Sequence, residues 1–144
     1  MNATATAATP APLIDRLVTE LAYPLVDTDN LDEIASSTEC LVLFFTEDPK
    51  RFPETNDVAV VLPELVKAFP RLTPAVVARG DEKILQNRYG FTSWPALVFL
   101  RRGGYLGVIT GIQDWQVYLQ RITRLLDSEP TRPPTLGIPV VSRQ

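Results

Sequence analysis

The stretch TSWPALVFL, residues 92–100, places a proline directly before an uninterrupted apolar run. A strand inside a sheet normally excludes proline, because proline has no N–H to donate to the ladder. Proline is tolerated at the start of a strand, so we predict a strand over Ala96–Arg101 that begins just after Pro95. The glycine-containing turn that follows, and the apolar segment Tyr105–Thr110, predict a second strand paired with the first as a hairpin.

Helical and strand patterns alternate along the chain before this hairpin. The segment CLVLFF at residues 40–45 is apolar on both faces, which is typical of a central strand covered by helices on both sides, usually in a parallel sheet. The predicted helices span 13–22, 30–35, 58–69 and 81–89 and begin again at 114, and the predicted strands span 25–26, 40–45, 75–78, 96–101 and 105–110. The order predicts an α/β fold with a central mixed sheet: three parallel strands plus an antiparallel C-terminal hairpin, flanked by helices on both faces.

Local signals refine the ends and faces of these helices. Asn30 followed by Glu33 resembles a capping box, and Asp114 can cap the last helix. Pro63 falls inside a helical stripe and is expected to kink that helix. Trp115 is predicted to lie on the core face of the last helix, in a stripe with Leu119, Ile122 and Leu126.

The length of 144 residues is that of one domain. We expect a flexible N-terminal tail at 1–12, a folded domain at 13–127 and a proline-rich, extended C-terminal tail at 128–144. No run of about 18 apolar residues is present, so we expect no direct insertion into a membrane. The first residues lack the basic and apolar regions of a secretory signal, which makes the cytoplasm the expected location.

The residue types available exclude several kinds of chemistry. The chain has one cysteine, Cys40, and no histidine, so an internal disulfide is impossible, and a soft metal site or a histidine-dependent acid–base centre is nearly excluded. A carboxylate-only Mg²⁺ or Ca²⁺ site stays open, but no Asp/Glu spacing resembles a calcium loop. We therefore predict no catalytic residue, no metal site and no cofactor. Cys40 begins the central strand, and we interpret it as an inert buried residue.

Acidic residues are concentrated in one part of the chain. Residues 27–57 contain nine carboxylates and only two basic side chains, Lys50 and Arg51. This charge excludes nucleic acid as an expected partner and favours a basic peptide. The alternative is a solvated acidic surface that serves solubility alone.

The element order, with a proline opening the first hairpin strand and Pro63 inside a long helix, resembles the thioredoxin fold. That resemblance implies a cis Trp94–Pro95 bond and a Trp94 backbone free to pair with an extended peptide. The alternative is a trans proline that only ends a loop. A redox thioredoxin carries Cys-x-x-Cys after its central strand, whereas the segment at 46–54 here reads TEDPKRFPE and holds no thiol.

A narrower resemblance is to the hydrogenase expression/formation accessory family of the HyaE, HupG and HoxO type, and it spans about residues 13–126. The motifs that carry it are Asp48-Pro49-Lys50-Arg51-x-Pro53-Glu54 with Asp57, Gly104-Tyr105-x-Gly107-Val108-x-x-Gly111-Ile112-x-x-Trp115, Glu64-Leu65, Phe69-Pro70, Tyr89-Gly90 and Pro95-Ala96. The resemblance implies a redox-inactive, cytoplasmic assembly factor for uptake [NiFe] hydrogenase rather than an enzyme. It implies that the partner is the hydrogenase small-subunit precursor, bound at or near its twin-arginine signal peptide, with other hydrogenase accessory proteins as further partners.

A twin-arginine peptide has a basic start and then an apolar run, so its site needs both carboxylates and an apolar groove. The carboxylates expected to contact the basic part follow the central strand, where open α/β sheets place their ligands. Aromatic side chains beside Pro95 are expected to form the apolar rim. The candidate partner-binding residues are Glu47, Asp48, Phe52, Glu54, Asp57, Trp94 and Pro95.

Structural roles are open for the same residues. Thr55 or Asn56 with Asp57 can cap the following helix, and Lys50 and Arg51 can pair with Glu54. Trp94 is equally expected as a packing residue beside the hairpin.

Two other functions compete with partner binding at this surface. One is a degenerate or monothiol oxidoreductase that uses Cys40. The other is a structural subunit that forms a homo-oligomer through exposed apolar surface alone.

Overall fold

Five strands form one mixed sheet in the computed structural model, which describes residues 11–135. The order across the sheet is β1-β3-β2-β4-β5. β1 and β2 both pair with β3 in parallel, whereas β4 pairs with β2, and β5 with β4, in antiparallel fashion. The predicted combination of three parallel strands and an antiparallel hairpin is confirmed. The strands are β1 (Leu25–Val26), β2 (Cys40–Phe45), β3 (Leu72–Val77), β4 (Ala96–Arg101) and β5 (Gly104–Thr110).

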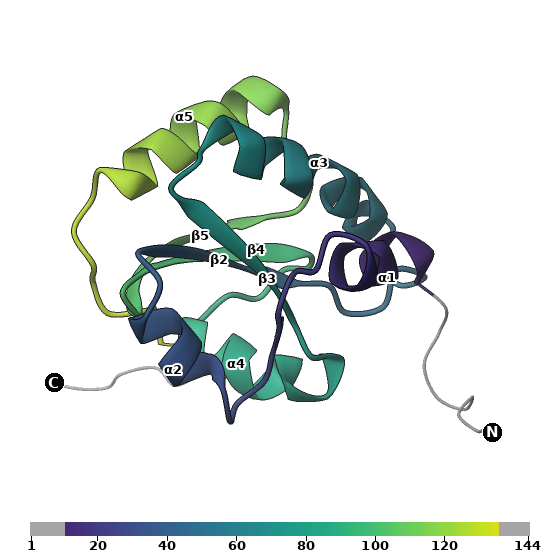
Figure 1. Ribbon diagram of the computed structural model, residues 1–144, viewed down its shortest axis with the longest axis horizontal. Coiled ribbons are helices and arrows are strands. Elements are labelled where there is room, and N and C mark those ends of the chain that lie inside the picture. Colours follow the sequence, from purple (N-terminus) through teal and green to yellow (C-terminus); the bar gives the residue numbers. More distant parts are fainter. Residues whose placement is uncertain (1–10, 136–144) are drawn as a thin grey trace, which may run out of the picture.

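Helices cover both faces of this sheet (Figure 1). α1 (Pro12–Thr19), α3 (Glu54–Ala68) and α5 (Trp115–Leu126) pack on one face, and α2 (Leu31–Ser36) and α4 (Glu82–Tyr89) pack on the other. A single 3-10 turn, η2 (Arg79–Asp81), precedes α4. All six residues of β2 are buried, because alternate side chains enter the two helix-covered cores. The prediction that this segment is a central strand covered on both faces is therefore confirmed.

Two prolines lie inside elements of the fold, one in a strand and one in a helix. β3 begins at Leu72, three residues before the predicted strand, and Pro74 lies within it opposite Val42 of β2. β1 pairs only with Val76 and Val77, so no strand on that side requires an N–H from Pro74. α3 runs from Glu54 to Ala68 with Pro63 inside it, as expected, but it begins four residues before the predicted helix.

Three predictions about helix ends and faces need correction. Asn30 and Asp114 occupy N-cap positions, but neither side chain makes a capping hydrogen bond. The Asn30 side chain instead accepts the N–H of Asp27 at 2.8 Å. Trp115 is not in the core and is 41% exposed, because the buried stripe of α5 consists of Tyr118, Ile122 and Leu126. Trp115 is the first residue of α5 and lies before this stripe.

The ends of the described chain lie against the domain. Ala11 is buried in the core that α1, α3 and α5 share, and α1 begins at Pro12. After α5 the chain continues along β5, where the N–H of Thr131 donates to the carbonyl of Tyr105 at 2.8 Å. Residues 1–10 and 136–144 of the two expected tails lie outside the described residues.

Candidate functional site

The loop that follows β2 carries the candidate acidic residues. Glu47 has a φ of +49°, in the left-handed region that non-glycine residues rarely occupy. Its carboxylate accepts the N–H of Asp48 at 2.6 Å and lies 3.9 Å from the Arg51 guanidinium. Asp48 accepts the N–H of Lys50 at 2.9 Å. The loop is thus stabilised by hydrogen bonds to its own carboxylates. It brings two acidic side chains, Glu47 and Asp48, close to two basic ones, Lys50 and Arg51.

A buried carboxylate accepts the hydrogen bonds of the residues that begin this loop. Glu82, in the first turn of α4, is 3% exposed and accepts the N–H of Glu47 at 3.0 Å. The hydroxyl of Thr46 donates to the same carboxylate at 3.3 Å. Burial, the dominant cause, raises the pKa of Glu82 to about 7, while the hydrogen bonds from Glu47 and Thr46 act in the opposite direction.

Glu82 was absent from the predicted site, although the sequence contained a signal for it. It shares one face of α4 with the buried residues Leu85 and Tyr89, at the spacing of a helical stripe. A carboxylate at such a position is expected to be buried and to require a partner.

Four aromatic side chains gather next to the loop. The ring of Trp94 lies 5.1 Å from that of Phe91, 6.0 Å from that of Phe45 and 6.4 Å from that of Phe52. Phe45 and Phe91 are buried, whereas Phe52 and Trp94 are half-buried. Phe52 and Trp94, predicted from distant parts of the sequence, are therefore side by side. The two buried rings lie beneath them, with their centres 4.7 Å apart, and form a buried support.

The Trp94–Pro95 bond is cis, as the thioredoxin resemblance implies. Pro95 is buried, and its carbonyl accepts the N–H of Gly111 at 2.8 Å. Among residues 11–135, neither the N–H nor the carbonyl of Trp94 has a hydrogen-bond partner. The backbone of Trp94, but not that of Pro95, is thus available to an extended peptide.

The four predicted carboxylates do not form a single cluster. Glu54 accepts the N–H of Ile112 at 2.7 Å, beyond the end of β5. Glu54 and Asp57 both lie close enough to Tyr118 to act against the ionisation of its phenol, whose pKa is raised chiefly by burial. Glu47 and Asp48 instead lie in the loop above Glu82. The acids therefore fall into two pairs on either side of the start of α3.

The local alternatives for this segment are also resolved. Arg51 pairs with Glu47 rather than with Glu54. No side chain caps α3, which begins at Glu54 after Pro53, and Asp57 lies in its first turn. Thr55 is buried, and its hydroxyl donates to the Thr46 carbonyl at 2.8 Å.

No thiol and no cluster of metal-ligating side chains lies at this end of the sheet in the part of the chain that the structure describes. Cys40 has no exposed surface and lies at the opposite end of β2 from the loop. In the part of the chain that the structure describes, no group of three or more His, Cys, Asp or Glu residues is placed to hold a metal ion. No helix within residues 11–135 combines the length and apolar character needed to cross a membrane.

The fold and the Trp94–Pro95 site define a thioredoxin-like protein whose thiol motif is replaced by an acidic and aromatic loop. Comparison with solved structures agrees: a Plasmodium falciparum thioredoxin superposes with a TM-score of 0.59 at 18% identity, covering 70% of this chain and 97% of that chain. This likeness shows the fold alone.

Residues 13–118 match the family described as Hydrogenase-1 expression protein HyaE. The chain is 54% identical over 131 residues to the hydrogenase expression/formation protein HoxO of Azotobacter vinelandii, covering 91% of this chain and 87% of that protein. HupG of Bradyrhizobium diazoefficiens is 50% identical over 101 residues, covering 69% of this chain and 68% of that protein. A crystal structure of hupG from Rhodopseudomonas palustris CGA009 matches with a TM-score of 0.52 at 47% identity, covering 72% of this chain and 94% of that chain. The protein belongs to the HyaE family of hydrogenase expression/formation proteins.

Proposed function

We propose that this protein is a non-catalytic assembly factor in the maturation of uptake [NiFe] hydrogenase. It binds the small-subunit precursor in the cytoplasm, at its twin-arginine signal peptide region, before export. Membership in the family supports the hydrogenase role. The observation that carries the binding role is the surface beside Pro95, where Phe52 of a thiol-free loop lies beside Trp94 and the same loop carries the half-buried carboxylates of Glu47 and Asp48.

The two halves of this surface suit the two halves of such a peptide. The basic start can pair with Asp57, whose carboxylate accepts no hydrogen bond among residues 11–135, and with the Oδ2 atom of Asp48, since only its Oδ1 accepts a backbone N–H, that of Lys50. Both carboxylate oxygens of Glu47 are already engaged, by the N–H of Asp48 and by Arg51. The apolar run can cover the exposed edges of Phe52 and Trp94, and the free backbone groups of Trp94 can pair with the peptide main chain.

The competing oxidoreductase function gains no support from the position of Cys40. A reactive thiol needs exposure and an electropositive setting, whereas Cys40 is buried among the apolar residues of β2. Alkylation of the folded protein separates the two functions, since a catalytic Cys40 would react rapidly with a thiol reagent.

The test is capture of two forms of the hydrogenase small subunit by the purified, tagged protein. We expect the precursor to be retained more strongly than the form that lacks the signal peptide. Substitution Asp48→Lys should weaken capture roughly three- to tenfold at low salt, because it replaces an attraction with a repulsion. Glu33→Lys, on the exposed face of α2, is the matched control and should leave capture unchanged. Failure to retain either form would contradict the proposal.

A further inference from the structure

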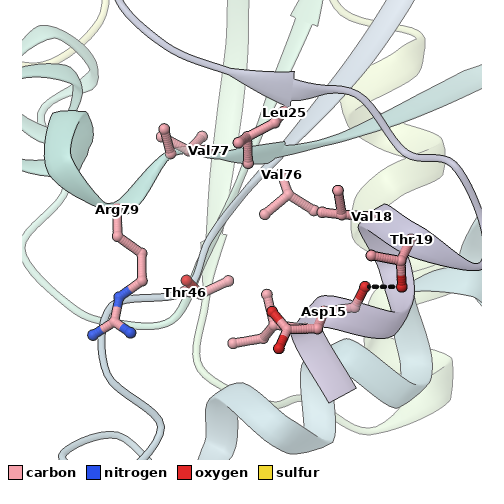
Figure 2. Close-up of a pocket in the computed structure, with 10 residues that line it drawn as sticks. Asp15, Val18, Thr19, Leu25, Thr46, Val76, Val77 and Arg79 are labelled. Atoms are coloured by element: carbon pink, nitrogen blue, oxygen red, sulfur yellow. Dashed lines mark hydrogen bonds between the residues drawn. The ribbon is translucent and has the colours of Figure 1, made fainter. Parts of the chain in front are cut away.

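We infer that the partner peptide has a second anchor point, a pocket beside α1 that receives one of its apolar side chains. The identity of the peptide rests on the proposed function, whereas the pocket is a feature of this chain. Its volume is about 280 Å³, just below the range for ligand pockets, which suits one or two side chains rather than a nucleotide. It is lined by Ile14, Asp15, Val18 and Thr19 of α1, Leu25 of β1, Thr46 after β2, and Val76, Val77, Ala78 and Arg79 at the end of β3 (Figure 2).

The walls of this pocket are mainly apolar. Val76 and Val77 close it from the sheet, and Val18 closes it from α1. Leu25 stands at its edge and is 51% exposed, although it belongs to a strand. Leu13, near the start of α1, and Leu21, two residues after its end, are also among the exposed large apolar residues. An apolar group that entered the pocket would therefore remove surface from water on the helix, the strand and itself.

The polar groups of the lining divide into two kinds. The hydroxyl of Thr19 donates to the carbonyl of Asp15, and the hydroxyl of Thr46 donates to Glu82. Figure 2 shows the Asp15 and Arg79 side chains on opposite sides of the pocket. Within residues 11–135, neither Asp15 nor Arg79 takes part in an ion pair. The pocket thus offers one anion and one cation around an apolar centre.

The place of the pocket connects it with the proposed binding surface. It lies at the carboxyl ends of the parallel strands, where open α/β sheets bind ligands. Thr46 lines the pocket, and the next residue, Glu47, begins the acidic loop. A peptide that crosses this loop toward Trp94 can therefore also reach the pocket.

These contacts select the chemistry of the occupant. An aliphatic or aromatic side chain fits the centre, a neighbouring basic side chain complements Asp15, and the Arg79 guanidinium can donate to a peptide carbonyl. Addition of a strand to β1 is disfavoured, because the Asn30 side chain already donates to the carbonyl of Leu25 at 3.2 Å. The partner therefore places a side chain in the pocket rather than pairing its main chain with β1. Its sequence carries apolar and basic residues next to each other.

Two substitutions test the pocket directly. Leu25→Glu places a charge at its edge on an already exposed residue, and Val18→Trp fills it from α1. A third substitution, Asp15→Asn, removes the charge of the pocket on α1. The matched controls are Ile84→Glu on α4, where the side chain is 60% exposed, and Glu20→Gln at the C-cap of α1, which removes a charge outside the pocket. Affinity is measured by calorimetry with a synthetic peptide that carries two arginines followed by a leucine-rich run, and methyl NMR locates the contact.

We expect Leu25→Glu and Val18→Trp to weaken peptide binding roughly tenfold or more, while circular dichroism shows an intact fold. Asp15→Asn should weaken it a few-fold and lower its salt dependence, and both controls should bind like the wild type. The methyl signals of Val18, Val76 and Val77 should shift when the peptide is added.

Three results would overturn the inference. If the wild type binds the peptide and the pocket variants bind it equally well, the pocket is wrong and the proposed function stands. If the wild type binds neither the peptide nor the precursor, the proposed function fails and the pocket with it. If Leu25→Glu instead changes only the molecular mass on dilution, the pocket contacts a second copy of the chain.

Discussion

The carboxylate of Glu82 accepts the backbone N–H of Glu47 at 3.0 Å and so joins the start of α4 to the loop after β2. The N–H in question belongs to a residue with a φ of +49°, which tertiary contacts must hold in place. Glu82 is therefore a positioning residue for the candidate site. It acts through the loop and lies beneath the partner surface.

The first prediction concerns pH. The pKa of Glu82 is about 7 in the folded protein, whereas a glutamate in the unfolded chain has the ordinary value of 4.5. Between these two pH values the folded state therefore retains a proton that the unfolded state has lost. Stability contributed by this proton is complete below about pH 4.5 and is lost as the pH rises through 7. Since the chain has no histidine, we expect the free energy of unfolding to fall by roughly 2–3 kcal/mol from pH 5 to pH 8 on this account.

Substitution Glu82→Gln isolates this effect. The amide keeps both hydrogen bonds, to Glu47 and Thr46, but cannot ionise. Urea unfolding at pH 5 and pH 8 should therefore show a much flatter profile for this variant, with a gain in stability at pH 8. Parallel profiles for the variant and the wild type would contradict the prediction.

The second prediction concerns Gly90, which ends α4 with a φ of +71°. A Cβ at this position would collide with the carbonyl of Pro134, in the segment that follows α5. We expect Gly90→Ala to lower the unfolding free energy by about 1–3 kcal/mol, through both the strained backbone and the displaced segment. Gly80→Ala is the control, because a Cβ there has nothing within 4 Å. Thermal unfolding of both variants gives the comparison.

The third prediction concerns Arg101, at the end of β4. Its guanidinium donates to the carbonyl of Ser128 at 2.8 Å and to that of Leu126, and so satisfies the C-terminal end of α5. Arg101→Ala should cost about 1.5–3 kcal/mol of stability, because these are charged hydrogen bonds in a partly buried position. Arg124→Ala, an exposed substitution on α5 itself, should change stability by less than about 0.5 kcal/mol in the same denaturant titration.

The fourth prediction separates binding from stability in the aromatic cluster. Phe52 is half-buried, its ring centre lies 6.4 Å from that of Trp94, and the Arg51 guanidinium lies 5.3 Å from it. We expect Phe52→Ala to lower stability by no more than about 1–2 kcal/mol but to weaken precursor capture roughly tenfold. Phe91→Ala, in the buried support, should instead cost about 3–5 kcal/mol. Equal capture by Phe52→Ala and wild type would remove this ring from the partner surface.

The fold could be predicted from the sequence wherever one pattern decided the element. The run CLVLFF can be buried on both faces only in a central strand, and Pro95 can only open the strand that follows it. The start of β3 was missed because Pro74 argued against a strand. Pro74 can lie within β3 because β1 is too short to pair with it and so needs no N–H from it. The length of β1 is a property of the whole sheet.

The candidate site was harder to predict, because hydrogen bonds decide which carboxylates are free. Glu47 and Glu54 look equivalent in the sequence, yet Glu47 accepts the N–H of its neighbour Asp48, whereas Glu54 accepts that of Ile112, 58 residues later. The contact of Phe52 with Trp94 came from the resemblance to a known fold, whereas Glu82 could have been found from its place on the buried stripe of α4. A hydrogen bond between residues so far apart in the chain leaves no pattern in the sequence around either of them.

The burial of Cys40 has a practical consequence. It is the sole sulfhydryl in the chain, and no part of it is accessible to a reagent. A cysteine introduced at an exposed position such as Ser93 or Lys50 would therefore be the one site that takes up a maleimide dye, a spin label or a crosslinker. The wild-type chain needs no cysteine substitution before such labelling. Labels placed at one introduced cysteine after another would then show which parts of the surface a bound partner covers.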